Sequence, residues 1–222
     1  MEYRILGKTG LKISRLGFGG IPIQRIDAEG TKKLLHEMVK KGINYIDTAR
    51  GYTVSEEYMG YAMEGIRDKF VVATKSMART KDAMRADIET SLGNLRTDYI
   101  DLYQVHNPSM EQLEQVMGED GALQALQEAK AEGKIGHIGL TAHSTAVFEK
   151  ALELHPGDDP KLNTRQDIEE LIDWCRKGIS LPQFSECFRE RTEDWWETFA
   201  EMEAQLRQMM DDDKDHTRGA EI

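Results

Sequence analysis

Polar residues that could carry out acid–base chemistry follow several short apolar runs of this sequence. They are Asp47, Lys75, His106 and, after a further run, Thr141 with His143. A carboxylate beside a lysine can hold it charged, and a charged lysine can lower the pKa of a nearby phenol. One polar residue at the end of a strand can simply meet solvent. An acid, a lysine and a histidine at successive strand ends are harder to explain in that way, so we expect a site for proton transfer.

Parallel strands would bring these residues to one edge of a sheet, and the chain alternates strand-like with helix-like segments. Strands are expected at 15–20, 44–47, 70–74, 99–105 and 135–141, and helices at 29–41, 55–65, 81–95, 121–133 and 144–154. A hairpin over residues 4–13 precedes them. Short apolar strands alternating with amphipathic helices predict parallel strands with right-handed crossovers. The predicted fold class is α/β, a partial (β/α) TIM-type barrel of about five units. In such barrels the carboxyl ends of the strands carry the active site.

Composition excludes several classes of protein. The chain has 222 residues and a formal net charge of -11, which argues against binding to nucleic acid. No run approaches the roughly 18 apolar residues of a membrane span. The first residues lack the pattern of a signal peptide. Two cysteines are too few for a disulfide framework or a four-thiolate metal site. We therefore expect a cytoplasmic protein with no metal, no membrane and no nucleic acid among its partners.

Several segments together resemble the signatures of the aldo-keto reductase family. They occur in the family's order and at its spacing, and they are 6–20, 42–52, 73–76, 98–106 and 133–139. The stretch Tyr52-Thr53-Val54-Ser55-Glu56 is most similar to a prokaryotic subgroup whose members often carry a cysteine-rich iron–sulfur tail. This chain lacks those cysteines. The resemblance covers residues 1–155.

The resemblance implies NADP(H)-dependent reduction of a small carbonyl substrate, an aldehyde or a ketone. The catalytic residues that it implies are Asp47, Tyr52, Lys75 and His106. Tyr52 is expected to be the general acid that protonates the carbonyl oxygen as hydride reaches the carbon. Lys75, paired with Asp47, is expected to tune that phenol. His106 is expected to orient and polarise the carbonyl.

The expected cofactor is NADP, and the residues expected to contact it are Gly19, Gly20, Asp47, Thr141 and His143. The family often has Ser-Asn where this chain has Thr141-Ala142. The family barrel has eight strands, and its later strands supply a residue that stacks on nicotinamide and a basic loop for the 2′-phosphate. We recognise no such basic loop after residue 154, and five units cannot close an eight-stranded barrel.

Residues beyond the five units differ in charge and pattern from the first part. Residues 156–222 carry 18 Asp and Glu against 9 Lys and Arg. We therefore divide the chain into an aldo-keto reductase-like part (1–155), a linker (156–163) and an acidic helical tail (164–222). We recognise no protein family in the sequence of the tail. Its most regular apolar stripe lies within 195–209 and comprises Trp195, Phe199, Met202, Leu206 and Met209.

That stripe, which we call the tail seam, has heptad spacing. It fits an ordinary core-facing helix or a coiled-coil dimer. Self-association through the tail seam or through the open edges of the sheet is therefore one expectation.

Three interpretations of the whole chain remain at this point. The first is a nicotinamide-dependent oxidoreductase, which the four catalytic-type residues favour. The second is a non-catalytic binding or assembly module, which the unrecognised phosphate loop favours. The third is an incomplete or artificial product of low stability.

Overall fold

The computed structural model describes residues 1–7 and 9–154 of the chain. The first element is the predicted hairpin, in which β1 (Tyr3–Ile5) pairs antiparallel with β2 (Lys12–Ser14). The hydroxyl of Tyr3 donates a hydrogen bond to the carbonyl of Gly42 at 2.8 Å, and the amide nitrogen of Ser14 donates to Oδ1 of Asn44 at 2.6 Å. The hairpin therefore packs against the segment just before β4 (Tyr45–Asp47), at the amino-terminal end of the sheet.

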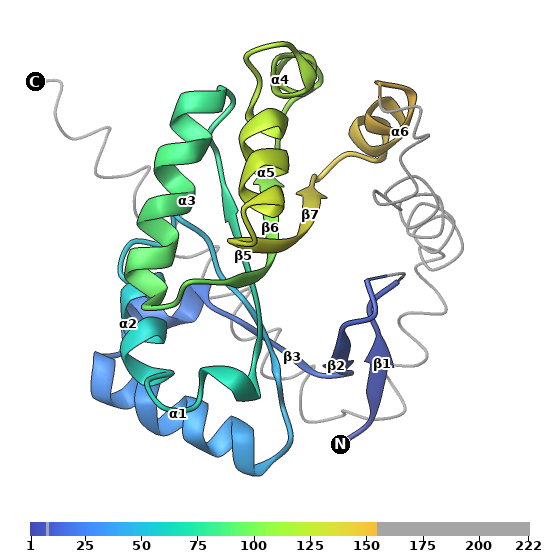
Figure 1. The fold of residues 1–222 in the computed structure, drawn as a ribbon. Coiled ribbons are helices and arrows are strands. Elements are labelled where there is room, and N and C mark those ends of the chain that lie inside the picture. Colours follow the sequence, from blue (N-terminus) through green and yellow to red (C-terminus); the bar gives the residue numbers. More distant parts are fainter. Residues whose placement is uncertain (8, 155–222) are drawn as a thin grey trace, which may run out of the picture. The chain divides into compact units, whose positions relative to one another are not determined.

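Five strands form one sheet, in the order in which they occur along the chain. They are β3 (Gly17–Gly19), β4 (Tyr45–Asp47), β5 (Val71–Ser76), β6 (Ile100–His106) and β7 (Ile135–Thr141). Every neighbouring pair is parallel, and Figure 1 labels β5, β6 and β7 close together in the sheet. The prediction of five parallel strands in barrel-like order is confirmed.

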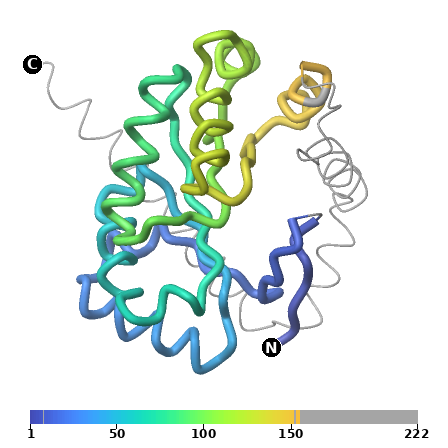
Figure 2. Tube along the Cα trace, viewed as in Figure 1, coloured from blue at the N-terminus to red at the C-terminus, as the bar shows by residue number. Residues whose placement is uncertain are grey.

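Helices connect the strands. They are η1 (Ile21–Arg25), α1 (Ala28–Lys40), α2 (Ser55–Ala62), η2 (Arg67–Lys69), α3 (Lys81–Leu95), α4 (Met110–Met117), α5 (Ala122–Ala131) and α6 (Thr145–Leu154). Helices α1, α2, α3 and α5 cover one side of the sheet, as Figures 1 and 2 show. Each predicted helix is present within a few residues of its expected bounds. Helix α4 was not predicted, although Ser109 and Gln112 form a capping box at its start.

The hydrophobic core lies between the sheet and the covering helices. Alternate residues of a strand point to opposite faces, so Ile46, Val72 and Tyr103 face the helices and are fully buried there. The helices contribute a matching set of buried side chains, which includes Leu35, Met59, Met84, Ile88 and Leu126. Each side chain of this size is worth roughly 1.5–3 kcal/mol when buried. This packing leaves the intervening strand residues on the other face.

Strand register brings the polar strand ends together. Asp47 is opposite Gly19 on β3 and Ala73 on β5. Lys75 is opposite Gln104, and His106 is opposite Thr141. Because all five strands run in the same direction, their carboxyl ends lie at one edge.

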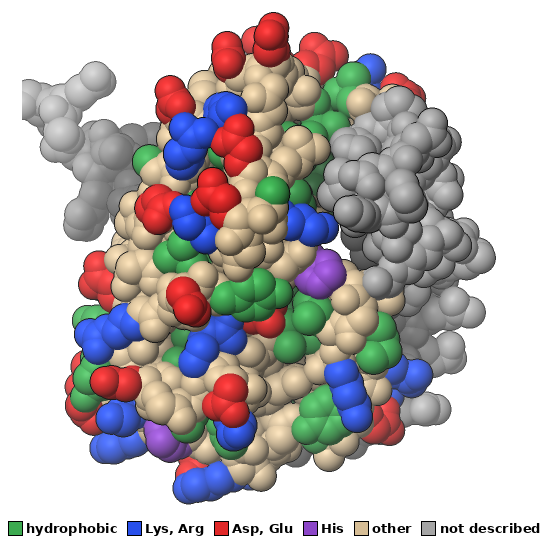
Figure 3. Space-filling view, viewed as in Figure 1, with side chains coloured by type: hydrophobic (Ala, Val, Ile, Leu, Met, Phe, Trp, Pro, Cys, Tyr) green, Lys and Arg blue, Asp and Glu red, His purple; other side chains and the backbone are tan. Residues whose placement is uncertain are grey.

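Some expectations lie outside the described residues. The tail seam and the helical tail (164–222) fall there, and the boundary at 155 with the linker 156–163 stays a prediction. No helix in the described part has the length and apolar character needed to cross a membrane. On the face that Figure 3 shows, acidic and basic side chains are intermingled, without a large area of one sign.

Candidate active site

A buried lysine and a carboxylate form the centre of the candidate site. The Nζ atom of Lys75 donates a hydrogen bond to Oδ1 of Asp47 and another to the carbonyl of Thr48 at 2.9 Å. The Lys75 side chain is 7% exposed and that of Asp47 is 32% exposed. The second oxygen of Asp47 accepts a hydrogen bond from Nε2 of Gln104 at 3.1 Å. These bonds stabilise the ion pair and fix the direction of the lysine.

Tyr52 and His106 lie against this pair. The Nζ atom of Lys75 is 5.1 Å from the centroid of the Tyr52 ring. The Tyr52 and His106 rings meet edge to face, with centroids 6.1 Å apart and an interplanar angle of 88°. The structure thus brings together all four side chains that the sequence put forward as catalytic.

The surroundings of the His106 imidazole favour its neutral form. Burial, followed by the positive charge of Lys75, lowers the pKa of His106 below its usual 6.5. Its Nδ1 atom is buried and makes no hydrogen bond within the part of the chain that the structure describes. A neutral imidazole carries one N–H, which can be donated to an oxygen atom of a bound molecule.

A second phenol near the pair does not suit proton donation. Tyr45 precedes Asp47 by two residues and lies on the same face of β4. Burial, with a smaller contribution from Asp47, raises the pKa of Tyr45 to about 12. The Tyr45 ring also packs closely on Gly17, where an added Cβ would lie 2.8 Å from its Cδ1 atom. Tyr45 is therefore a packed phenol that strongly retains its proton.

Backbone and hydroxyl contacts hold the turn that leads into Tyr52. The amide nitrogen of Gly20 donates to the carbonyl of Asp47 at 2.7 Å. The hydroxyls of Thr48 and Ser55 are 2.9 Å apart, and that of Ser55 donates to the carbonyl of Gly20 at 2.9 Å. An added Cβ at Gly20 would lie within 3 Å of both hydroxyls, whereas one at Gly19 would meet no atom within 4 Å. Gly20 is thus required for close packing, and Gly19 borders open space.

The remaining predicted cofactor residues lie at the carboxyl end of β7. The Thr141 hydroxyl accepts a hydrogen bond from the amide nitrogen of Asn107 at 3.1 Å. The amide nitrogen of His143 donates to Oδ1 of Asn107 at 3.2 Å, and the His143 side chain is exposed. Both residues are held beside His106 by Asn107. Their contact with a cofactor, like that of Gly19, Gly20 and Asp47, stays a prediction.

The sequence did not put forward the side chains of Gln104 and Arg79 at this site, and it marked Asn107 only as a polar residue at a strand end. The sequence could have indicated Gln104, because this residue precedes His106 by two positions and therefore lies on the same face of the strand. Asn107 adopts a left-handed backbone conformation (φ 44°) just after β6. The guanidinium of Arg79 donates to the carbonyls of His106 and Asn107 at 2.8 and 3.3 Å. The sequence pattern does not indicate Arg79, because its partners lie far from it in the chain and only the fold brings them together.

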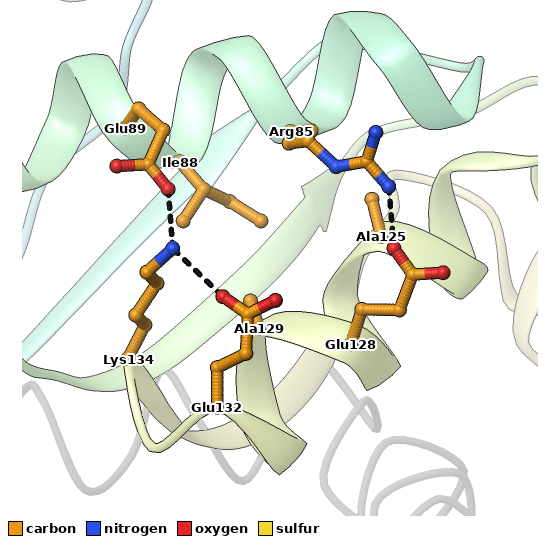
Figure 4. Close-up of a pocket in the computed structure, with 8 residues that line it drawn as sticks. All are labelled: Arg85, Ile88, Glu89, Ala125, Glu128, Ala129, Glu132 and Lys134. Carbon is orange, nitrogen blue, oxygen red and sulfur yellow. Dashed lines mark hydrogen bonds and ion pairs between the residues drawn. The ribbon is translucent and has the colours of Figure 1, made fainter.

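A separate hollow lies on the outer surface between α3 and α5 (Figure 4). Its charges are paired across the gap. Lys134 contacts Glu89 and Glu132, each at 2.7 Å, and Arg85 contacts Glu128 at 2.6 Å. Because these charged side chains are paired with one another, we interpret the hollow as the gap between two packed helices.

The fold and the site together define a β/α-barrel type of protein with a cluster of ionisable side chains at the carboxyl ends of its strands. Comparison with family models identifies it further. Residues 15–177 match the model of the aldo/keto reductase family, and the chain belongs to that family. The resemblance seen in the sequence motifs is confirmed.

Known relatives agree with this assignment. The chain is 31% identical to L-galactose dehydrogenase of Arabidopsis thaliana over 199 residues, which cover 81% of this chain and 58% of the relative. It is also 31% identical to the aldo-keto reductase YhdN of Bacillus subtilis over 194 residues, covering 78% and 57%. The chain thus spans somewhat more than half the length of these curated relatives.

Solved structures share the fold. The holo form of aldo-keto reductase AKR11C1 from Bacillus halodurans has a TM-score of 0.62 and 31% identity, covering 69% of this chain and 54% of that chain. An aldo-keto reductase from Klebsiella pneumoniae in complex with NADPH has a TM-score of 0.59 and 26% identity, covering 68% and 53%.

Proposed function

We propose that the protein is an NADP(H)-dependent oxidoreductase that reduces the carbonyl group of an aldehyde or a ketone. One observation carries the proposal. The buried Lys75, paired with Asp47, lies over the Tyr52 ring, and the His106 ring meets the Tyr52 ring edge to face. A phenol, a lysine and a neutral imidazole at one point form a site that can donate a proton to a carbonyl oxygen.

Each residue has a distinct role in the proposed reaction. Tyr52 gives its phenolic proton to the carbonyl oxygen of the substrate. Lys75 keeps a positive charge close to that phenol, because Asp47 and the carbonyl of Thr48 hold its ammonium group. His106, whose neutral form is favoured by burial and by Lys75, donates its N–H to the same oxygen and so orients and polarises the carbonyl.

The part of the site that lies near Gly19 and His106 fits a nicotinamide cofactor. Gly19 borders open space at the end of β3, and the buried Nδ1 atom of His106 has no partner in residues 1–7 and 9–154. The bound nicotinamide would supply hydride to the carbonyl carbon. Gly19, Thr141 and His143 are the residues that would border it. The NADPH complex of the Klebsiella pneumoniae relative supports this choice of cofactor.

Two measurements test the proposal. Binding is measured by titrating the protein with NADPH and following cofactor fluorescence. Turnover is measured by the loss of NADPH absorbance with a panel of aldehydes and ketones. The names L-galactose dehydrogenase and D-galacturonate reductase, borne by two relatives, make the corresponding sugars useful first members of the panel. Absence of both binding and turnover across the panel would contradict the proposal.

The remaining predictions about cellular context rest on the sequence. A cytoplasmic location is one of them. Self-association through the edges of β3 and β7 is another, since each pairs on one side only in the described sheet.

A further inference from the structure

We propose that Glu56 is a positioning residue for the active site. It lies in the first turn of α2, and its side chain is 1% exposed. It acts from the helix-covered face of the sheet, where it fixes the loop that carries Tyr52 and the strand end that carries Lys75. The inference rests on the proposed function, in which those two residues act on the substrate.

Four donors surround the Glu56 carboxylate. Its Oε1 atom accepts hydrogen bonds from the hydroxyls of Thr74 and Ser91, both at 2.8 Å. Its Oε2 atom accepts from Nη1 of Arg50 and from Nδ2 of Asn94, both at 3.2 Å. A buried carboxylate is costly unless it is paired and hydrogen-bonded, and here both oxygens are satisfied. The charge is therefore a fixed anchor that joins β5, α3 and the loop before α2.

Two of the donors are immediate neighbours of active-site residues. Arg50 precedes Tyr52 by two residues, and its backbone N–H donates to the carbonyl of Lys75 at 2.9 Å. Thr74 precedes Lys75 on β5, so its side chain lies on the opposite face of the strand. Glu56 thus connects the segments that carry the tyrosine and the lysine.

A second carboxylate extends the same connection. Oδ1 of Asp87, on α3, lies 3.5 Å from Nε of Arg50, and Asp87 also accepts a hydrogen bond from the hydroxyl of Ser76. Ser76 follows Lys75 directly. The residues on either side of Lys75, Thr74 and Ser76, therefore each donate a hydrogen bond to a carboxylate on a helix. Arg50 contacts both of these carboxylates.

The loop around Tyr52 is held locally by backbone bonds of Tyr52 to Ala49 and Ser55, and the Arg50 side chain adds its connection to the carboxylates of α2 and α3. Gly51 and Thr53 are exposed, and an added Cβ at Gly51 would meet no atom within 4 Å. A displacement of about 1 Å at a reacting group can cost on the order of 100-fold in rate. Loss of the Arg50–Glu56 contact should therefore lower turnover by moving Tyr52, without removing any group that touches the substrate.

The variant Glu56→Gln tests this inference. Its side-chain oxygen can still accept from Thr74 and Ser91, but its amide directs N–H groups at Arg50. Glu57→Gln is the matched control, because it makes the same chemical change at the next residue, which is exposed. Both variants are compared with the unchanged protein by steady-state kinetics and by hydrogen–deuterium exchange. The exchange of peptides covering 48–55 is compared with that of peptides covering β7.

We expect kcat of Glu56→Gln to fall by roughly 10- to 100-fold, with KM and cofactor affinity changed by less than about twofold. Exchange should become at least about tenfold faster in 48–55 and stay unchanged in β7, because local opening is confined to the released loop. The control should match the unchanged protein in every measurement. If exchange rises evenly in both regions, or if kcat stays within about twofold, the positioning role is wrong and the network only stabilises the fold.

If Glu56→Gln fails to fold, Asp87→Asn replaces it, because Asp87 is one-third exposed and holds the same Arg50 side chain. The same local gain in exchange is expected there, and an unchanged pattern would overturn the inference. If the unchanged protein reduces no carbonyl compound, the proposed function fails, and the exchange comparison alone decides whether Glu56 fixes the loop.

Discussion

Adding one methyl group at Gly20 should destabilise the protein, whereas the same change at Gly19 should not. An added Cβ at Gly20 would lie 2.7 Å from Cε of Met59 and 2.9 Å from the hydroxyl oxygens of Ser55 and Thr48. The methionine end can move away. The two hydroxyls are short side chains tied to each other and to the carbonyl of Gly20, so they must shift by roughly half an ångström to reach ordinary contact.

Overpacking of this kind typically costs about 1–3 kcal/mol, which lowers the melting temperature of a chain of this size by roughly 2–12 °C. Gly20→Ala and Gly19→Ala are compared by thermal unfolding and by NADPH titration. Neither site has a left-handed backbone, so steric contact alone separates the two variants. Gly19→Ala should melt like the unchanged protein and weaken cofactor binding. Equal melting temperatures for the two variants would refute the packing argument.

Three other predictions follow, two from contacts in the structure and one from the sequence of the tail. Lys75→Met should raise the pKa of His106, because it removes a positive charge and leaves the Asp47 carboxylate unpaired; NMR titration of the imidazole measures this, and an unchanged or lower pKa would contradict it. Asp101→Asn should lower the free energy of unfolding by about 1–3 kcal/mol and leave turnover of the folded protein unchanged, since Asp101 accepts from Arg67 at 2.7 Å and from the backbone of β5. A urea titration with an activity assay checks both parts. Deleting residues 157–222 should give an aggregating protein, as judged by light scattering, because we expect the apolar tail seam to cover sheet surface that five units leave bare; a soluble monomer that melts cooperatively would refute that expectation.

The fold could be predicted because its pattern is local. Each strand is a short apolar run and each long helix has an apolar stripe, so their order alone indicates a parallel sheet. Helix α4 was missed because it is short and only Leu113 and Val116 are buried in it. The capping pair Ser109 and Gln112 was the available signal.

The site was predictable only in part, for a different reason. Its catalytic-type residues lie at strand ends or in the family motif, where sequence position fixes their place. The groups that hold them in place are joined over long separations. Glu56 and Asn94 are 38 residues apart in the chain, and Arg79 reaches His106 across 27. Gly20 could be noticed as a glycine near the site, but only the structure shows the two hydroxyls that require it.

The most direct test of the proposed chemistry is the rate of NADPH-dependent carbonyl reduction by Tyr52→Phe. Tyr3→Phe is its control, because that phenol also makes a hydrogen bond but lies in the hairpin at the amino-terminal end of the sheet. Removal of the proton donor should lower kcat by roughly 100- to 10,000-fold while NADPH affinity stays nearly unchanged. The control should retain full turnover. If Tyr52→Phe reduces the same substrates as fast as the unchanged protein, Tyr52 is not the general acid and the proposed mechanism is wrong.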